Sequence, residues 1–173
     1  MVIPAETIPW VPKEPPRTQV NKGKKRLGEI LIEKGLLTAE RLALALGEQV
    51  ITKELLGTIL VRRKWIKEED LLAALSEQHN LPLVDLKNRQ IDWNIIKYFS
   101  SSLIFDCHCV PFARDEHSVT MAISNPFDAW TIKRAEDEAR GLELKLALAS
   151  QEDIDDVIKR YQLYIFKKTH PKP

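Results

Sequence analysis

The chain has 173 residues, of which 44% are hydrophobic and 29% charged, as in ordinary soluble proteins of one domain or two small ones. Its net charge of +1 divides into +3 over residues 1–25, +3 over residues 164–173 and about −5 between them, which disfavours the basic face that non-specific nucleic-acid binding requires. No apolar run approaches the ~20 residues of a membrane span, and prolines interrupt the segment where a signal peptide would lie.

The first 24 residues predict a flexible, proline-rich arm. Five prolines fall within residues 1–16, and proline both fixes φ and removes a backbone donor. Neither a helix nor a central strand is therefore expected before residue 25.

Residues 26–78 contain the same pattern twice, with corresponding positions 29 residues apart. The first copy starts Arg26-Leu-Gly-Glu-Ile-Leu and ends at Gln49, and the second starts Leu55-Leu-Gly-Thr-Ile-Leu and ends at Gln78. Apolar residues recur at helical spacing in both copies, which predicts two helical hairpins. Two copies are too few for a solenoid. The hairpins therefore either share one core and nothing more, or form a pseudo-symmetric site in which each copy holds half of a ligand.

Local signals predict the ends of these four helices. The first is expected from about Lys25 to Lys34, with Gly35 as its terminating residue. Thr38 and Thr52 are expected to cap the second and third helices. The fourth helix is expected from about Lys67 to His79.

From residue 81 the pattern changes to that of a small mixed unit. Alternating apolar residues predict three strands, at Cys107–Ala113, His117–Ser124 and Leu142–Ala149. Asp128 and Ser150 are expected to cap the helices that precede and follow the third strand.

The predicted fold class is α+β: an N-terminal four-helix subdomain built from a tandem helical-hairpin repeat, followed by a small α/β subdomain with about three strands. The predicted boundaries are residues 25–80 for the helical subdomain, residues 81–164 for the α/β subdomain and residues 165–173 for a basic tail.

Motifs that carry chemistry are sparse. Cys107 and Cys109 are too close in sequence to share a disulfide easily, so we expect two small buried residues in a reducing, cytoplasmic compartment. The histidines offer no zinc-ligand spacing, and phosphate-binding, dinucleotide-binding, metalloprotease and serine-hydrolase motifs are absent. We therefore expect a non-catalytic protein without a metal or cofactor.

The start of each repeat is the remaining candidate site. Arg26 precedes Leu27 and Gly28 at a predicted helix start, where free backbone N–H groups and the helix dipole favour an anion. The Arg26 guanidinium can pair with phosphate or stack on a purine, and the Gln49 amide can pair with a base edge. Two structural alternatives remain open: Gly28 can serve close helix packing, and Gln49 can cap its own helix.

The tandem motif resembles that of the MshEN domain, the N-terminal domain of type II secretion and type IV pilus assembly ATPases. The motif reads Arg-Leu-Gly-x-x-apolar-apolar-x-x-Gly-apolar-apolar-x4-Leu-x3-Leu-x2-Gln, and residues 50–54 separate its two copies. The downstream runs Cys109-Val-Pro-Phe, Val119-Thr-Met-Ala-Ile-Ser-Asn-Pro-Phe-Asp and Ala149-Ser-Gln-Glu-Asp-Ile also look like that family. The resemblance covers about residues 25–161.

The resemblance implies a receptor for cyclic di-GMP, in which each motif holds one half of a two-fold symmetric ligand, largely by apolar contact. The implied ligand-binding residues are Arg26, Leu27, Gly28, Leu31, Gly35, Leu42, Leu46 and Gln49 in the first repeat, and Leu56, Gly57, Leu60, Leu71, Leu75 and Gln78 in the second. Asp128 is a further candidate, as an acceptor for a guanine edge, with helix capping as its alternative role.

Two positions of the second copy depart from the motif: Leu55 stands where arginine is expected, and Lys64 where glycine is expected. The loss of one charge-assisted contact is worth roughly 1.5–3 kcal/mol, or about ten- to a hundredfold in affinity. Arg62 or Lys64 could compensate, although a lysine held at positive φ costs about 1 kcal/mol. The expected site is therefore lopsided.

Two functions are compatible with this sequence. The ATPases of the family continue into a nucleotide-hydrolysing core, and nothing in these 173 residues supplies one. The first hypothesis is a cyclic di-GMP receptor that passes ligand occupancy to a secretion, pilus or other partner protein. The alternative is a docking domain of such a system that has weakened or lost nucleotide binding. Neither hypothesis involves nucleic acid or a membrane span.

Overall fold

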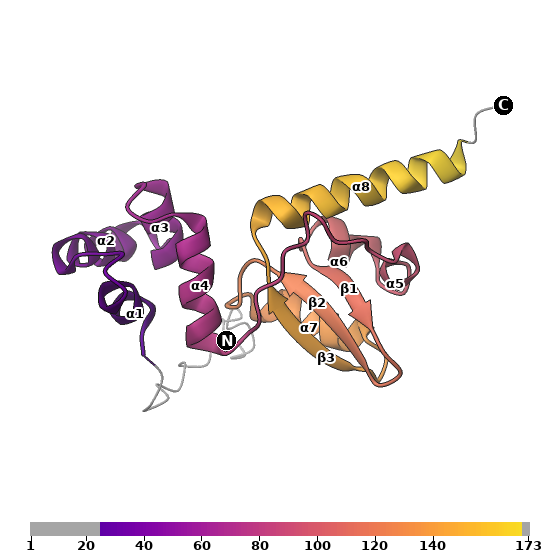
Figure 1. The fold of residues 1–173 in the computed structure, drawn as a ribbon, viewed down its shortest axis with the longest axis horizontal. Helices are drawn as coiled ribbons and strands as arrows, with labels where there is room; N and C mark the ends of the chain where they lie inside the picture. The colour runs from indigo at the N-terminus through magenta and orange to yellow at the C-terminus, as the bar shows by residue number, and fades with distance from the viewer. Residues whose placement is uncertain (1–24, 171–173) are drawn as a thin grey trace, which may run out of the picture.

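The computed structural model describes residues 25–170, and the arm predicted over residues 1–24 lies outside them. A helical subdomain and an α/β subdomain lie side by side (Figure 1), as the predicted α+β class requires. In chain order, the elements are α1 (Leu27–Glu33), α2 (Ala39–Thr52), α3 (Leu56–Arg62), α4 (Glu68–His79), α5 (Trp93–Ile96), α6 (Ser101–Phe105), β1 (Val110–Arg114), β2 (Ser118–Ile123), α7 (Ala129–Glu138), β3 (Glu143–Leu148) and α8 (Gln151–Thr169).

The two repeats fold into matching hairpins, α1–α2 and α3–α4. The first helix of each has seven residues, preceded by an extended residue at Arg26 or Leu55. Each hairpin then turns through a residue in the left-handed region, Gly35 with φ of 70° and Lys64 with φ of 56°. The sequence therefore predicted correctly that Lys64 occupies a position suited to glycine.

The predicted cap of the third helix was wrong. Thr52 is the last residue of α2, which ends at the left-handed Lys53 (φ 61°). The Thr52 hydroxyl donates to the Glu48 carbonyl oxygen and accepts the Glu54 backbone N–H, so it closes α2 and shapes the link to α3. Threonine is common both at helix starts and in turns that follow helices, and the two possibilities look alike in sequence.

The α/β subdomain is built on a three-stranded sheet in the order β1-β2-β3. β1 and β2 are antiparallel, and β2 and β3 are parallel because α7 connects them as a crossover. Residues 82–84 run beside the end of β3, where the Val84 N–H donates to the Leu148 carbonyl oxygen and the Leu148 N–H donates to that of Pro82. β1 begins three residues later than predicted, because His108 has a φ of 49° and breaks the extended run.

Two hydrophobic clusters lie on opposite faces of the sheet. Met121 and Ile123 of β2 point into a cluster that includes α7 and continues through α1, α3 and α4. Ala122, between them, points into a second cluster with α5, α6 and α8. The two subdomains are therefore joined by one continuous core.

The cysteines are free thiols in different surroundings. Cys109 is completely buried, and burial raises the pKa of its thiol to about 12. Cys107 is half-buried, and the Arg134 guanidinium lies 3.7 Å from its sulfur. Within residues 25–170, no group of three metal-ligating side chains forms a cation site, and no helix is both long and apolar enough to cross a membrane.

Exchanging the two turn residues tests the strain at Lys64. We expect Lys64→Gly to raise the free energy of unfolding by about 0.5–1 kcal/mol, since glycine relieves the left-handed strain but adds entropy to the unfolded chain. Gly35→Lys should lower it by a similar amount. Urea denaturation measures both, and a less stable Lys64→Gly protein would contradict the strain interpretation.

Candidate ligand-binding groove

A groove of about 410 Å³ lies where the two repeats meet the loop between β2 and α7. Its lining combines apolar side chains with uncharged polar ones. The lining residues are Leu27, Gln49, Leu55, Leu56, Gly57, Thr58, Leu71, Leu75, Gln78, Ser124, Asn125 and Phe127. The groove thus draws on both repeats and on the α/β subdomain.

Two glutamines link the repeats reciprocally. Gln49, which ends the first motif, donates its side-chain N–H to the carbonyl oxygen of Glu54, just before the second motif (2.9 Å). Gln78, which ends the second motif, donates to the carbonyl oxygen of Lys25, just before the first motif (3.2 Å). Each copy therefore holds the start of the other, and the pair of contacts defines a pseudo-two-fold axis. The sequence suggested that Gln49 either pairs with a base edge or caps its own helix, and this contact between the repeats is neither of those roles.

The groove lies on the pseudo-two-fold axis and extends from it toward the second repeat only. Leu27 and Leu56 are equivalent in the two motifs, and both line the groove together with the two glutamines. The other repeat residues in the lining belong to the second copy. Their counterparts in the first copy lie on the open side: Leu46 is 44% exposed, whereas its equivalent Leu75 is 5% exposed. The β2–α7 loop walls only the second copy's side, and this accounts for the asymmetry.

The two motif glycines permit close packing of each hairpin. A Cβ atom on Gly28 would lie 2.7 Å from a methyl carbon of Leu42, and one on Gly57 would lie 2.8 Å from a methyl carbon of Leu71. These pairs are equivalent in the two repeats. The packing role left open from sequence for Gly28 is therefore the one that the geometry supports, although Gly57 also borders the groove.

The remaining sequence-predicted residues lie away from the groove lining. Leu31 and Leu60 are fully buried in the core, and Gly35 forms the first hairpin turn. Asp128 borders a neighbouring cavity of about 300 Å³, and both its carboxylate oxygens accept hydrogen bonds from Thr131, from the backbone N–H and the hydroxyl. Asp128 therefore caps α7, which is the alternative role that the sequence suggested for it.

Arg26 is exposed beside the axis and makes no ion pair with another residue of the described range. Its backbone N–H donates to the Glu29 carboxylate (2.9 Å), so one of the donors expected to bind an anion is already occupied. Its counterpart Leu55 lies in the groove lining and is 45% exposed. The repeats thus present a cation on one side of the axis and a hydrocarbon on the other.

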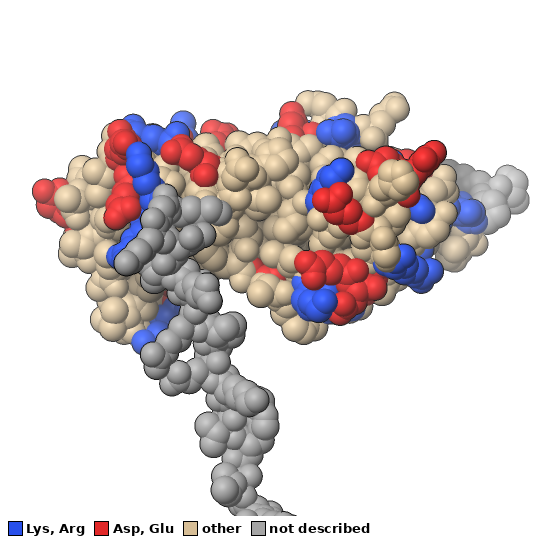
Figure 2. All heavy atoms as spheres, turned by 90° about the horizontal axis from the view of Figure 1, so that it is seen from below, with Lys and Arg blue, Asp and Glu red and all other residues tan. Residues whose placement is uncertain are grey.

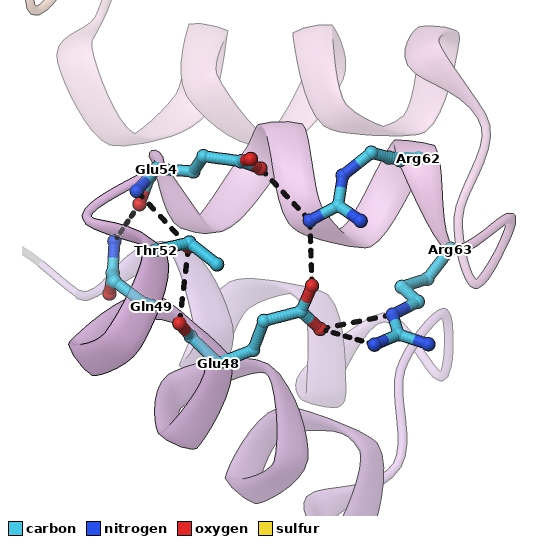
Figure 3. Close-up of polar contacts among 6 residues, drawn as sticks. All are labelled: Glu48, Gln49, Thr52, Glu54, Arg62 and Arg63. Atoms are coloured by element: carbon cyan, nitrogen blue, oxygen red, sulfur yellow. Dashed lines mark hydrogen bonds and ion pairs between the residues drawn. The ribbon is translucent and has the colours of Figure 1, made fainter.

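Arg62 is not available to replace the missing arginine. Its guanidinium pairs with Glu48 (2.6 Å) and Glu54 (3.0 Å), and Arg63 also pairs with Glu48 (2.9 Å), as Figure 3 shows. The hydrogen bond that Arg62 donates to Glu48 lowers the pKa of the Glu48 carboxyl and raises the pKa of the Arg62 guanidinium. This network ties the end of α2 to α3 outside the groove lining.

The groove itself is electrically neutral. No Lys, Arg, Asp or Glu is among its lining residues. On the face shown in Figure 2, charged side chains gather over the two subdomains and are sparse in the belt between them. One polar atom stands out: the side-chain oxygen of Gln78 is buried and has no hydrogen-bond partner among the described residues. A buried acceptor without a partner is costly, so this oxygen favours a ligand that offers a donor.

The contribution of the β2–α7 loop to the groove was not predicted from the sequence. Ser124, Asn125 and Phe127 line the groove, and the Phe127 ring meets the edge of His79 with 4.9 Å between centroids. The Asn-Pro turn signal directly after a predicted strand could have identified this loop, because loops that follow strands commonly carry binding residues.

The fold is therefore a tandem helical hairpin joined to a small α/β unit, with a neutral groove on the repeat axis. Residues 79–164 match the family model described as MshEN domain. These residues belong to the MshEN family, and the resemblance predicted from the sequence is confirmed.

Curated relatives agree with this assignment. The chain is 29% identical over 139 residues to the type IV pilus assembly ATPase PilB of Myxococcus xanthus, covering 79% of this chain and 24% of the relative. It is 30% identical over 117 residues to PilB of Thermus thermophilus, and this match covers 66% of this chain and 13% of the relative. The chain therefore spans a quarter or less of the length of these relatives.

Solved structures extend the likeness to the helical subdomain. MshE, solved with cdg (cyclic di-GMP), superposes with a TM-score of 0.74 at 25% identity, covering 80% of this chain and 99% of that one. The N-terminal domain of XpsE gives a TM-score of 0.60 at 25% identity, and the match covers 78% of this chain and 92% of that one. The fold is thus that of the N-terminal domain of secretion and pilus assembly ATPases.

The glycine–leucine contacts predict which glycines the fold requires. Gly57→Val should lower the free energy of unfolding by about 1–3 kcal/mol, because the branched side chain collides with Leu71. Gly47→Val is the matched control, since Gly47 lies in α2 with open space around its Cα and should change stability by under about 0.5 kcal/mol. Chemical denaturation measures both, and adding Leu71→Ala to Gly57→Val should recover part of the loss. Equal effects at the two glycines would contradict the packing role.

Proposed function

We propose that this chain is a cyclic di-GMP-binding regulatory domain without catalytic activity of its own. The observation that carries the proposal is the groove on the pseudo-two-fold axis, because a two-fold symmetric ligand matches a site to which two equivalent motifs contribute. The likeness to MshE, whose structure was solved with cyclic di-GMP, supports the same ligand.

The two sides of the axis would hold the ligand differently. One base would enter the neutral groove, against Leu71 and Leu75 and facing Phe127, with a donor directed at the free oxygen of Gln78. The other half would lie across the open side, over Leu46 and beside the Arg26 guanidinium. Apolar contact would supply most of the affinity, and the Arg26 guanidinium would donate paired hydrogen bonds to the edge of the guanine beside it.

Ligand binding would couple the two subdomains. The groove is lined by residues of both, so an occupant would contact α4 and the β2–α7 loop together. A ligand shifts a conformational equilibrium only through such differential contacts. The proposed output is a change in how the domain engages a secretion or pilus partner.

One observation favours the docking alternative as well. Leu44, Val50 and Ile51 on α2 are 64%, 68% and 83% exposed. In the second repeat, the position equivalent to Val50 is His79, which is half-buried and packs against Phe127 of the β2–α7 loop. Exposed apolar side chains gathered on one helix are typical of a protein-interaction surface.

Isothermal titration calorimetry with cyclic di-GMP tests the receptor proposal. We expect saturable binding by the wild-type protein and about ten- to a hundredfold weaker binding by Arg26→Ala, the loss of one charge-assisted contact. Arg114→Ala is the control, since Arg114 is exposed at the end of β1, against Tyr98 and away from the groove. Absence of binding heat at high micromolar ligand would reject the proposal.

The docking alternative is tested with the double variant Val50→Ser, Ile51→Ser. We expect this variant to lose capture of a secretion or pilus partner protein, because polar side chains remove the apolar contact, and to keep its binding of cyclic di-GMP. Leu163→Ser, at an equally exposed site on α8 (60%), should retain capture. Pull-down with the purified partner protein measures capture, and unchanged capture by the α2 variant would contradict the docking role of α2.

A further inference from the structure

The two sides of the repeat axis differ in the group that can recognise a base. At the start of the first repeat stands Arg26, and at the equivalent position of the second stands Leu55, which faces the groove. An arginine reads guanine through paired hydrogen bonds to O6 and N7, atoms that adenine does not present as two acceptors. Leucine cannot make that distinction.

No other cation restores the missing guanidinium. The lining of the groove contains no charged side chain, and the nearest arginine in sequence, Arg62, is committed to Glu48 and Glu54. The second repeat's side therefore offers a base only apolar surface and uncharged polar atoms.

This side of the groove suits a base better than a phosphate. A phosphodiester placed among Leu71, Leu75 and Phe127 would lose its hydration without gaining a cation, which is strongly unfavourable. The flat face of a purine instead replaces water at apolar surface and at the ring of Phe127. The residue at position 55 would then lie beside a base.

The free polar atom of Gln78 does not choose between purines. The Gln78 amide nitrogen is occupied by the Lys25 carbonyl oxygen, which leaves its buried side-chain oxygen as an acceptor. Adenine offers the N6 amine to such an acceptor, and guanine offers N1–H and the N2 amine. Amide side chains are also the usual partners of adenine.

We infer that the second repeat's side of the groove accepts adenine as readily as guanine, so that the ligand class of this chain includes the mixed cyclic dinucleotide of one guanosine and one adenosine monophosphate. This inference rests on the proposed function. Arg26 retains its preference for guanine, so the mixed ligand binds in one orientation, with guanine on the first repeat's side. Leu55 is the specificity-determining residue.

Calorimetric titration with cyclic di-GMP, cyclic GMP–AMP (both linkages 3′,5′) and cyclic di-AMP tests the inference. For the wild-type protein we expect the first two to bind within about fivefold of each other and cyclic di-AMP to bind about five- to 150-fold more weakly, the range for one arginine–guanine pair. Leu55→Arg should tighten cyclic di-GMP by a similar factor and leave cyclic GMP–AMP nearly unchanged. Leu55→Met is the matched control and should alter no ratio.

Each other outcome has a defined meaning. A wild-type preference for cyclic di-GMP over the mixed ligand of more than about tenfold overturns the inference and leaves the receptor proposal standing. Equal tightening of all three ligands by Leu55→Arg shows a phosphate contact at position 55 and also overturns it. If no cyclic dinucleotide binds, the receptor proposal fails, and the inference fails with it. The wild-type ratio alone decides the case if Leu55→Arg does not fold.

Discussion

The reciprocal hydrogen bonds of Gln49 and Gln78 are the constraint on which the helical subdomain depends. Each glutamine closes one hairpin and fixes the backbone that opens the other. The four short helices are thereby held as one symmetric unit, although α1 and α3 have only seven residues each and would be marginal alone. The same two side chains border the groove, so the residues that join the repeats also form part of the site between them.

Symmetry in the backbone coexists with asymmetry in the chemistry. The turns, the glycine–leucine contacts and the glutamine bonds recur in both copies. Arg26 and Leu55, however, occupy equivalent positions with different chemistry, and only the second copy's side of the groove is walled by the α/β subdomain. A duplicated unit whose second copy packs against a further subdomain cannot remain equivalent, because one copy is buried where the other meets solvent. The groove reflects that difference, with Leu75 covered and Leu46 open.

Sequence reasoning was most successful where the signal is periodic or tied to a backbone requirement. The tandem hairpins, the strands β2 and β3, the Ser150 and Asp128 caps and the left-handed Lys64 all follow from local pattern. It failed where one residue type serves two local purposes, as with Thr52, and where a histidine interrupts an alternating run, as at the start of β1. The short helix α6, capped by Ser100, was also not anticipated, because three serines in a row read as a simple break.

The candidate site was only partly accessible from sequence for a different reason. The motif identifies positions equivalent by duplication, and seven of them line the groove, but it cannot say which copy the rest of the chain covers. Leu31 and Leu60 match the motif yet belong to the core, and Phe127 lies outside the motif yet borders the groove. Contacts between segments that are distant in sequence decide which residues are buried in the core and which line the groove. No local sequence pattern shows these contacts.

The carboxylate of Glu68, at the start of α4, accepts the backbone N–H of Gln151, the first residue of α8 (3.1 Å). α8 has 19 residues, about 28 Å at the helical rise, and its far end projects well beyond the sheet (Figure 1). The start of α8 is thus bonded to the helix that borders the groove. A change in the angle between α4 and the sheet would be carried along α8 to its far end, where Phe166 is exposed.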